Sequence, residues 1–348
     1  MPAASVRVLI VDDSVVARAV IARALAGSDR LTVVGAVGSA AAALAFLATD
    51  DVDIILLDVA MPGMDGLTVL PELLVAGRGA KVVIVSAASG DGAASVQALA
   101  LGAADTVVKP SSGGMSATFA AQLIERLERL ADRPAPRAAM VCPVPARPLP
   151  PSPELGSGFD MVAIGASTGG IYALGHLLRA LPARFQLPVI ITQHLPASFM
   201  PFFAAQLASM SGRPCDVATD RMRIRPGRVV IAPGDAHIRC VAIGEGAAAI
   251  RLSTQSATSG CLPSVDPMFA SLAAIYGPRL LAIVLSGMGR DGLEGARVVR
   301  ETGGSVVVQD QASSVVWGMP GVVAAQGLAH AVLPPDEIGR LVAARCRP

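Results

Sequence analysis

Ser167 is the residue whose surroundings most clearly suggest chemistry. It lies in the small-residue run AIGASTGGI, directly after MVAIG and directly before GIYALGHLLRAL, whose apolar residues repeat at helical spacing. Apolar residues followed by glycines predict a strand that ends in a tight turn, so Ser167 is expected where a strand gives way to a helix. Free backbone N–H groups and the helix dipole favour negative charge at such a turn. Two kinds of chemistry fit: the turn binds the phosphate of a ligand, or the serine hydroxyl is itself a nucleophile.

Attack by Ser167 would need a base and an acid that orients the base, and the sequence offers one of each. GASTG fits the short G-x-S-x-G pattern of hydrolase nucleophiles, which is easily matched by chance. The strand-like run LPVIITQHLP leads to His194, and Asp291 follows another strand in the glycine-rich turn of LLAIVLSGMGRDGLEGARVV. If these strands are neighbours in one parallel sheet, the three side chains converge at one edge of it. Their order along the chain differs from that of the α/β-hydrolases, which argues against that fold but not against the chemistry.

Each member of this set also has an ordinary structural interpretation. Ser167 could cap its helix, or bind phosphate together with Thr168 and Gly169. An isolated histidine such as His194 is more often a hydrogen-bonded core residue, and Asp291 could hold its own turn through its side chain. A dinucleotide site is disfavoured, because GASTGG lacks the central glycine of that fingerprint and no Walker lysine follows.

A second group of polar residues follows the apolar runs in the first half of the chain. Asp12 and Asp13 close the first run, Asp58 the third and Ser86 the fourth, and Lys109 comes after the fifth. Any one of them could be an ordinary strand-end or helix-capping residue. Together, three carboxylates at one edge would repel each other unless a hard cation such as Mg²⁺ lay among them. With Lys109 to balance added negative charge, the set predicts a carboxylate that accepts a phosphoryl group.

The elements expected to position these residues alternate between short apolar runs and helical patterns. In the first half VRVLIVDD, LTVVGAV, VDIILLD, KVVIVSA and DTVVKP are each followed by a helical segment. Strands that are apolar throughout and alternate with helices predict a parallel sheet covered on both faces, with its sites at the carboxyl ends of the strands. The expected fold class is α/β, with an N-terminal (βα)5 domain and a C-terminal Rossmann-like domain, both doubly wound parallel sheets.

A proline-rich segment divides the chain. RPAPRAAMVCPVPARPLPPSPELGSG has too many prolines for regular hydrogen bonding and too few apolar residues for a core, so we expect a semi-rigid linker rather than a ligand for another domain. The predicted boundaries are residues 1–132 for the first domain, 133–158 for the linker and 159–348 for the second domain. A chain of 348 residues is long enough for two domains with cores of their own.

Composition argues against several classes of function. With a formal net charge of +1 and 3% aromatic residues, the chain shows neither a basic bias nor many stacking platforms, so no nucleic-acid partner is expected. No uncharged apolar run reaches transmembrane length, and Arg7 and Asp12 interrupt the start before a signal-peptide core could form, so no membrane insertion is expected. Five scattered cysteines without C-x-x-C spacing indicate reduced, structural thiols in a cytoplasmic protein.

The first half resembles the receiver domain of bacterial two-component response regulators. VLIVDDS, LLDVAMPGMDG, IVSA and VVKP occur in the order of that family over residues 5–131. The resemblance implies that Asp58 is the phospho-acceptor and that Ser86 and Lys109 contact the phosphoryl oxygens. It also implies a histidine kinase as the phosphodonor.

The same resemblance implies a Mg²⁺ site in this domain. Its ligands would be Asp13, Asp58 and the backbone carbonyl of Ala60, with Asp12 as an outer partner. Thr106 stands where such domains commonly carry an aromatic residue. Phosphorylation is therefore expected, but without the usual coupling to a reorienting ring.

The second half, residues 159–344, resembles the catalytic domain of chemotaxis protein-glutamate methylesterases. AIGASTGG, ITQHLP, IAPGDAH, PSVDPMFASLA, SGMGRDG and QDQAS followed by GMP fall in the order of that family. The resemblance implies Ser167 as the nucleophile, His194 as the general base and Asp291 as its orienting acid. It places the backbone N–H of Met288 in the oxyanion hole.

Two further residues match motifs of the same family. Thr168 lies beside the nucleophile, where it would help to position His194 or the substrate. His237, in APGDAH, is expected to have a structural rather than a catalytic role.

Together the two resemblances cover nearly the whole chain and imply a phosphorylation-activated hydrolase. Family members remove glutamyl γ-methyl esters as methanol from the cytoplasmic helices of chemoreceptors, by an acyl-serine mechanism that needs no cofactor. Glutamine presents the same acyl carbon, so deamidation is implied as a second activity. The expected location is the cytoplasm, with recruitment to receptor arrays left open.

Two other classes of protein remain alternatives. A phosphorylation-controlled docking module without esterase turnover would not require a Ser–His–Asp set. A transcriptional regulator is disfavoured by the near-neutral charge and by the strand–helix alternation of the second half.

Overall fold

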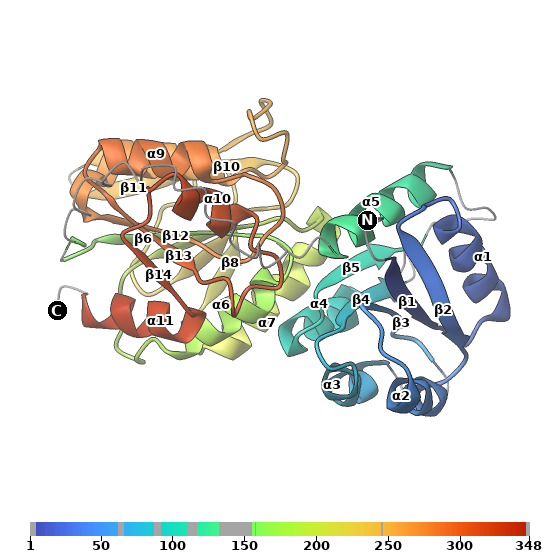
Figure 1. The fold of residues 1–348 in the computed structure, drawn as a ribbon. Coiled ribbons are helices and arrows are strands. Elements are labelled where there is room, and N and C mark those ends of the chain that lie inside the picture. Colours follow the sequence, from blue (N-terminus) through green and yellow to red (C-terminus); the bar gives the residue numbers. More distant parts are fainter. Residues whose placement is uncertain are drawn as a thin grey trace, which may run out of the picture. The chain divides into compact units, whose positions relative to one another are not determined.

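The computed structural model describes residues 5–61, 66–86, 92–109, 117–131, 155–156, 158–244 and 246–345. The chain divides into two compact units, Met1–Cys142 and Pro143–Pro348, drawn as a ribbon in Figure 1. Most of the predicted linker, residues 133–158, lies outside the described residues, so its boundaries and its extended form stay predictions.

The first unit is a five-stranded parallel sheet in the order β2-β1-β3-β4-β5. Its strands are β1 (Val6–Val11), β2 (Leu31–Val37), β3 (Ile54–Asp58), β4 (Lys81–Ser86) and β5 (Asp105–Val108). Its helices are α1 (Val15–Leu25), α2 (Ala40–Thr49), α3 (Gly66–Ala76), α4 (Gly92–Leu101) and α5 (Ala117–Ala131). Every residue of β3 is buried, as expected for a central strand with helices on both faces. The predicted (βα)5 fold is confirmed.

The second unit is a seven-stranded parallel sheet in the order β14-β13-β12-β6-β7-β9-β8. Its strands are β6 (Met161–Ala166), β7 (Val189–Gln193), β8 (Cys215–Val217), β9 (Val229–Ile231), β12 (Leu280–Val284), β13 (Ser305–Gln309) and β14 (Ala331–Leu333). A separate antiparallel hairpin consists of β10 (His237–Gly244) and β11 (Ala247–Ser253). The predicted doubly wound parallel sheet is confirmed, with the hairpin added to it.

Helices cover both faces of this second sheet. They are α6 (Gly170–Arg179), α7 (Met200–Ser211), α8 (Val265–Tyr276), α9 (Leu293–Glu301), α10 (Met319–Ala325) and α11 (Pro335–Ala344), with short 3₁₀ turns η1 (Ala197–Phe199) and η2 (Gly277–Arg279). In Figure 1, α9 and the hairpin lie on one side of the sheet, and α6, α7 and α11 lie on the other. Gly165 lets α8 pack closely on β6, since a Cβ there would lie 2.5 Å from Val265 Cγ1.

The central strand β6 is the point at which the strand order reverses. From β6 the chain passes through α6 to β7 on one side, and it returns much later to β12 on the other side. In open α/β sheets a crevice forms at this point, outside the carboxyl ends of the strands. A site built from the loops after β6, β7 and β12 is therefore expected on the topology alone.

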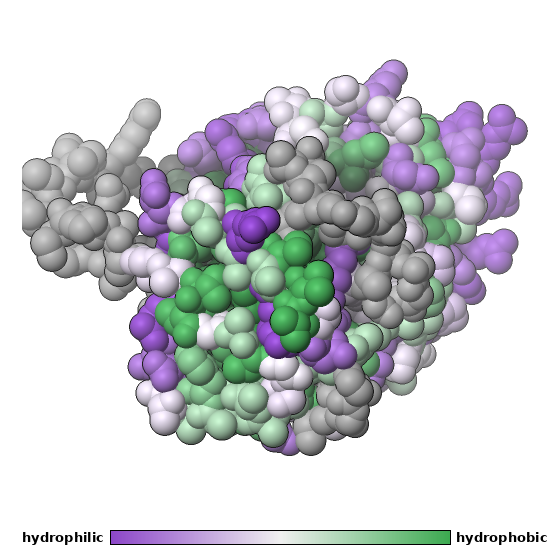
Figure 2. All heavy atoms as spheres, turned by 90° about the vertical axis from the view of Figure 1, so that its right-hand side faces the viewer, coloured by the Kyte–Doolittle hydropathy of each residue, from purple (hydrophilic) through white to green (hydrophobic). Residues whose placement is uncertain are grey.

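Large exposed apolar side chains occur on both units. Val15, Val16 and Val20 project from α1, and Figure 2, which faces this side of the chain, shows hydrophobic residues grouped on its surface. Within the described ranges, every helix is too short or too polar to cross a membrane.

Candidate functional site

The three candidate catalytic residues of the second unit follow neighbouring strands. Ser167 follows β6, His194 follows β7, and Asp291 lies in the loop after β12. β6 pairs with both β7 and β12, as the sequence interpretation required. Two further hydrogen bonds extend these ladders into the loops: Ser167 N–H donates to Ser286 O (3.0 Å), and His194 N–H donates to Ala166 O (3.1 Å). The sheet therefore fixes the backbone positions of Ser167 and His194.

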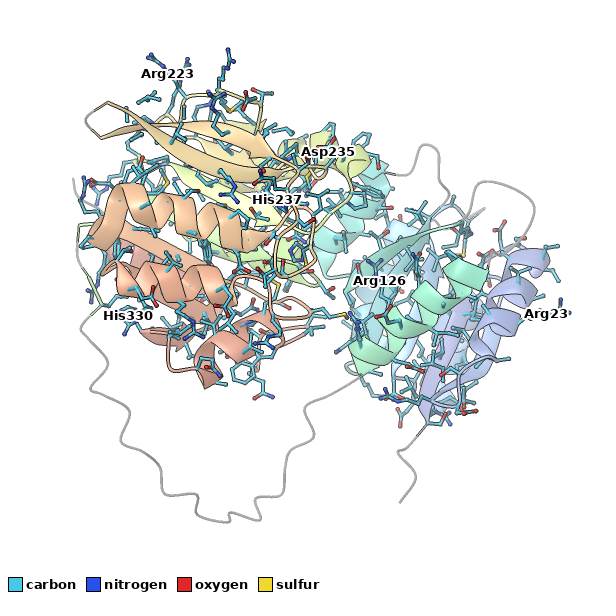
Figure 3. All side chains as sticks on the ribbon, turned by 90° about the horizontal axis from the view of Figure 1, so that it is seen from above. Arg23, Arg126, Arg223, Asp235, His237 and His330 are labelled. Carbon is cyan, nitrogen blue, oxygen red and sulfur yellow. The ribbon has the colours of Figure 1, made fainter. Side chains whose placement is uncertain are left out.

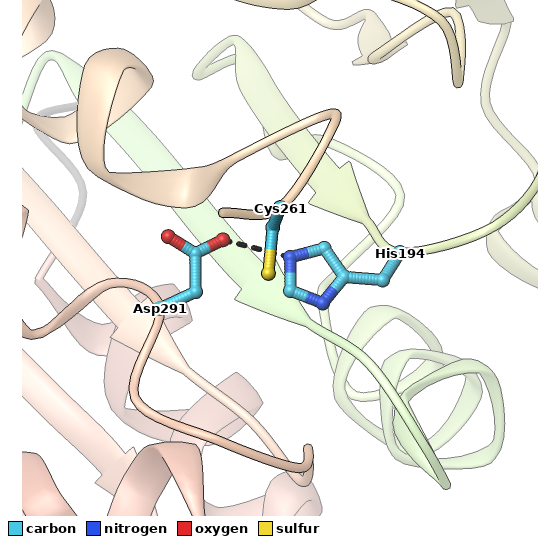
Figure 4. Close-up of side chains that lie close together, drawn as sticks. All are labelled: His194, Cys261 and Asp291. Atoms are coloured by element: carbon cyan, nitrogen blue, oxygen red, sulfur yellow. Dashed lines mark hydrogen bonds and ion pairs between the residues drawn. The ribbon is translucent and has the colours of Figure 1, made fainter. Parts of the chain in front are cut away.

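Asp291 is a buried carboxylate whose oxygens are fully engaged. It is 1% exposed, and His194 Nε2 lies 2.7 Å from its Oδ2 (Figure 4). Ser264 Oγ donates to Oδ1 (2.7 Å), and the backbone N–H of Val265 donates to Oδ2 (2.8 Å). Burial by itself raises the pKa of Asp291, but these hydrogen bonds, led by that of His194, lower it to about 2. Asp291 is therefore ionised at neutral pH and fixed in place.

His194 is half-buried, and its pKa reflects two opposing effects. Burial lowers the pKa of His194, but the interactions with the Asp291 carboxylate and, after it, with Cys261 outweigh burial and raise it to about 9. Because Nε2 is engaged by Asp291, the other ring nitrogen, Nδ1, is the one that can take a proton from a nucleophile.

Ser167 has a fixed backbone. Its carbonyl accepts from Gln193 Nε2 (2.8 Å) and from Gly170 N–H (2.8 Å), so the turn is tied both to β7 and to the start of α6. Within the described residues no hydrogen bond engages the Ser167 hydroxyl, and none joins it to His194. Catalytic hydrogen bonds are often long without substrate, so the arrangement is compatible with a nucleophile.

Two glycines let the loops approach Ser167. Gly169 has a left-handed backbone (φ 76°), and a Cβ there would lie 2.5 Å from Val315 Cβ. A Cβ on Gly287 would lie 2.8 Å from Ser167 Cβ and would also clash with Met319. Both positions thus accept only glycine without rearrangement.

The oxyanion donors must come from a restricted set of amides. The N–H groups of Ser167, Gly170 and Gly287 already donate to Ser286 O, Ser167 O and Val316 O, so they cannot hold an oxyanion. Met288 is half-buried and directly follows Gly287, the residue that packs against Ser167.

Thr168 is buried in the same turn as Ser167. Its backbone carbonyl accepts from Ser286 Oγ (2.8 Å), which ties the turn to the loop after β12.

Sequence reasoning missed the residues that hold Asp291 in place. Ser264 directly precedes α8, where serine usually caps a helix, but its hydroxyl donates to Asp291 instead. Its backbone N–H donates to His237 Nδ1 (2.8 Å), and His237 Nε2 donates to Gln255 O (2.8 Å). His237 is 1% exposed and lies inside the second unit (Figure 3). These contacts support the structural role expected for His237.

Cys261 is a second unpredicted neighbour of the candidate base. One ligand atom each from His194, Cys261 and Asp291 lie within 4.8 Å of one another, and Figure 4 shows the thiol beside the histidine ring. The sequence indicates only a structural thiol at this position, because nothing in its spacing links it to a histidine.

The first unit brings its predicted residues to the carboxyl ends of its strands. Carboxylate oxygens of Asp12, Asp13 and Asp58 lie within 4.8 Å of one another. Asp12 and Asp58 are buried, whereas Asp13 is exposed. Lys109 Nζ donates to Asp12 Oδ2 and Asp58 Oδ2, both at 2.8 Å. This acidic pocket is the one predicted from the strand ends.

The charges of this pocket are not balanced. Burial raises the pKa of Asp58 despite its hydrogen bond to Lys109. Burial alone would lower the pKa of Lys109, but its bonds to Asp12 and Asp58 raise it. One ammonium group faces three carboxylates, so the pocket suits an additional hard cation with oxygen ligands. Ala60 is exposed at the pocket, and its N–H donates to Asp58 Oδ1 (3.3 Å).

Ser86 and Thr106 are buried hydroxyl residues next to this pocket. Ile84 pairs with Thr106, and residues two apart on a strand face the same side, so Ser86 and Thr106 share one face of the sheet. Neither hydroxyl has a hydrogen-bond partner among the described residues. The structure thus leaves the Ser86 hydroxyl available to a phosphoryl oxygen.

A separate polar cavity of about 600 Å³ lies in the second unit. It is lined mainly by charged residues of the segment between β8 and β9, among them Arg223, which Figure 3 labels. Asp216 and Asp220 neutralise part of this positive charge. None of the candidate catalytic residues lines it, so the chemistry at Ser167 does not use this cavity.

Known protein families match both units. The CheB methylesterase family matches residues 162–342, and the response regulator receiver domain matches residues 8–115. The fold and the two sites thus define a response regulator whose output domain is a methylesterase.

Relatives cover nearly the whole chain. Protein-glutamate methylesterase/protein-glutamine glutaminase 1 of Paramagnetospirillum magneticum is 41% identical over 96% of this chain and 94% of its own length. Protein-glutamate methylesterase/protein-glutamine glutaminase 2 of Caulobacter vibrioides is 41% identical over 98% of this chain. The crystal structure of the Thermotoga maritima CheB methylesterase catalytic domain matches with a TM-score of 0.52 and 35% identity, covering 54% of this chain and 98% of that one. The chain belongs to the CheB family of receiver-controlled protein-glutamate methylesterase/protein-glutamine glutaminases.

Proposed function

We propose that this chain hydrolyses glutamyl γ-methyl esters on the cytoplasmic helices of chemoreceptors, releasing methanol, with Ser167, His194 and Asp291 as its catalytic residues. Family membership supports the activity. The observation that carries the residue assignment is the 2.7 Å contact between His194 and Asp291, formed beside the turn that holds Ser167.

The chemistry follows from the two nitrogens of His194. Nδ1 takes the proton of the Ser167 hydroxyl as Oγ attacks the ester carbonyl, while Asp291 stabilises the imidazolium through Nε2. The N–H groups of Met288 and Gly169 hold the oxyanion, each donor contributing about 3–4 kcal/mol. Methanol leaves with the proton from His194. Water, activated by the same histidine, then hydrolyses the acyl-serine.

Deamidation of receptor glutamines would use the same residues. The γ-amide presents the same acyl carbon to Ser167, and ammonia replaces methanol as the leaving group. Thr168, buried beside the nucleophile, would position His194 or the substrate.

The receiver would control this activity through Asp58. Asp13, Asp58 and the carbonyl of Ala60 would hold Mg²⁺, with Asp12 as an outer partner; the ion, when bound, neutralises carboxylate charge so that an anionic donor can approach. Ser86 and Lys109 would contact the oxygens of the phosphoryl group on Asp58. The unbalanced acidic pocket supports this assignment. A histidine kinase would supply the phosphoryl group.

The partners and location that fit this function are those of a receptor-signalling enzyme. We infer methylated chemoreceptor helices as substrate, a cytoplasmic location and no nucleic-acid partner, with recruitment to receptor arrays left open. The alternative is a docking module without esterase turnover, and it is disfavoured because docking does not require a His194–Asp291 pair beside a serine.

Release of volatile labelled methanol tests the proposal. The purified chain, supplied with Mg²⁺ and acetyl phosphate, should release label from receptor membranes carrying methyl-labelled esters, and it should convert receptor glutamines to glutamates. A chain that binds the membranes but releases no methanol above the buffer rate would contradict esterase activity and favour docking.

A further inference from the structure

Cys261 is the side chain at the candidate active site that the esterase mechanism does not use. It lies half-buried in the loop between β11 and α8, whereas His194 follows β7 and Asp291 follows β12. The thiol, the imidazole and the carboxylate each offer one ligand atom, and the three atoms lie within 4.8 Å of one another (Figure 4). Three segments far apart in the sequence thus place a sulfur, a nitrogen and an oxygen donor around one point.

This donor set differs from that of the receiver. The acidic pocket at Asp58 offers only oxygen ligands, which suit Mg²⁺. A thiolate combined with imidazole and carboxylate suits Zn²⁺, whose sites use these three side-chain types. We propose that His194, Cys261 and Asp291 form an inhibitory Zn²⁺ site, with a water molecule in the fourth position.

The site needs only a small rearrangement. With metal–ligand distances of about 2.0–2.3 Å, neighbouring ligands of a tetrahedral zinc lie about 3.4 Å apart. His194 Nε2 and Asp291 Oδ2 are 2.7 Å apart and must separate by less than about 1 Å. Ser264 and Val265 keep Asp291 in place, so the ring of His194 and the thiol of Cys261 make the adjustment.

Zinc binding releases protons from its protein ligands, as it does at other zinc sites. Zn²⁺ binds the thiolate, so the Cys261 thiol releases one proton to solvent. Nε2 must offer its lone pair, so a second proton leaves whenever His194 is in its doubly protonated form. No oxidant, reductant or further reactant takes part.

Zinc binding would hold His194 in a tautomer that cannot accept a proton from Ser167. A neutral imidazole that binds a metal through Nε2 carries its proton on Nδ1. Nδ1 is the nitrogen that should accept the proton of Ser167, so hydrolysis stops while the fold is unchanged. Inhibition therefore rests on the proposed role of His194, whereas metal binding itself does not.

Cobalt absorption and methanol release test the two parts separately. The chain is prepared with Cys142 and Cys346, which lie outside the described residues, replaced by alanine, and excess Mg²⁺ occupies the receiver pocket. Co²⁺ should give a thiolate-to-metal charge-transfer band with this chain and with the control Cys215→Ala, but not with Cys261→Ala. Zn²⁺ should inhibit methanol release, and Cys261→Ala should raise the inhibitory concentration by about 10- to 100-fold or more.

A measurement on the unmutated chain tests the zinc site without depending on whether a variant folds. Zn²⁺ should protect Cys261, but not Cys215, from alkylation by iodoacetamide, as mapped by mass spectrometry. An equal charge-transfer band in Cys261→Ala, or alkylation of Cys261 unaffected by Zn²⁺, would overturn the zinc site. Binding through the thiolate with unchanged methanol release would overturn the inhibition and contradict His194 as the base.

Discussion

At the scale of single residues, Asp291 determines how the candidate active site behaves. It is buried, ionised and held by donors from the start of α8 as well as by His194. A carboxylate fixed in this way holds the imidazole in one orientation and leaves Nδ1 for the nucleophile. We therefore expect His194 and Asp291 to act as one unit with Ser167.

The losses in kcat caused by substituting Ser167 and His194 should be strongly non-additive. His194→Ala should lower kcat for methanol release by about 10⁴- to 10⁶-fold, and adding Ser167→Ala should cost little more. Asp291→Asn should cost about 10⁴-fold or less, because the base remains but its orientation and tautomer are lost. Steady-state kinetics on methylated receptor membranes give these values. Losses that multiply in the double variant would show that Ser167 and His194 act independently.

The pH dependence of activity should follow His194. A base whose folded pKa is raised from 6.5 to about 9 is protonated, and inactive, over most of the neutral range. With EDTA present to keep metals off the site, kcat/KM should rise with pH and level off above about pH 9. Asp291→Asn removes the carboxylate that raises the pKa while burial still lowers it, so its profile should shift to lower pH. Identical profiles for the two chains would contradict the assignment.

Sequence patterns could predict only the residues that follow regular strands. Ser167 and His194 each come directly after an apolar run, and the glycine-rich turn marked Asp291. Ser264 and Cys261 come from an irregular loop, where no periodicity says which side chains turn inward. Their contacts with Asp291 and His194 arise from tertiary packing, which the order of residues does not show.

At the scale of elements, strand adjacency brings the site together. The alternation of apolar runs and helical patterns predicted parallel sheets in both halves, and both are present. The order of strands was not predictable, because β12 lies beside β6 although more than a hundred residues separate them in sequence. The hairpin of β10 and β11 also went unpredicted, since its strands carry no distinctive alternation.

The turn after β6 should tolerate only glycine at residue 169. Gly169 and Gly260 have similar backbone angles (φ 76° and 72°), but a Cβ at Gly169 would clash with Val315, whereas one at Gly260 would meet nothing within 4 Å. Gly260→Ala should cost about 1–2 kcal/mol of unfolding free energy from the backbone alone. Gly169→Ala should cost about 1–3 kcal/mol more. Urea unfolding followed by the fluorescence of Trp317, the single tryptophan, measures both; equal losses would rule out the clash.

At the scale of the whole molecule, the chain consists of two compact units. The sequence predicts that the proline-rich linker between them is semi-rigid. A receiver tied close to the esterase can inhibit it by covering the active-site edge, because the tether keeps its local concentration high. A phosphoryl group on Asp58 adds negative charge and should weaken such a contact.

Inhibition by the receiver should be partial and graded. A complete switch needs about 5.5 kcal/mol of differential stabilisation, more than one phosphoryl group usually supplies. A fragment of residues 158–348 should therefore release methanol faster than the unphosphorylated whole chain, and phosphorylation should raise the whole chain toward that rate. Asp58→Asn should stay at the unphosphorylated rate. Equal rates for the fragment and the unphosphorylated chain would leave recruitment to receptors as the role of the receiver.

The role of Ser167 is tested most directly by the rate at which Ser167→Ala releases methanol from methylated receptor membranes. We expect a loss of at least about 10⁴-fold relative to the phosphorylated parent chain, because without the serine hydroxyl the acyl-serine route is lost and only slow, direct attack by water remains. Ser211→Ala, a serine at the end of α7, should keep the parent rate. Release by Ser167→Ala at near the parent rate would contradict Ser167 as the nucleophile.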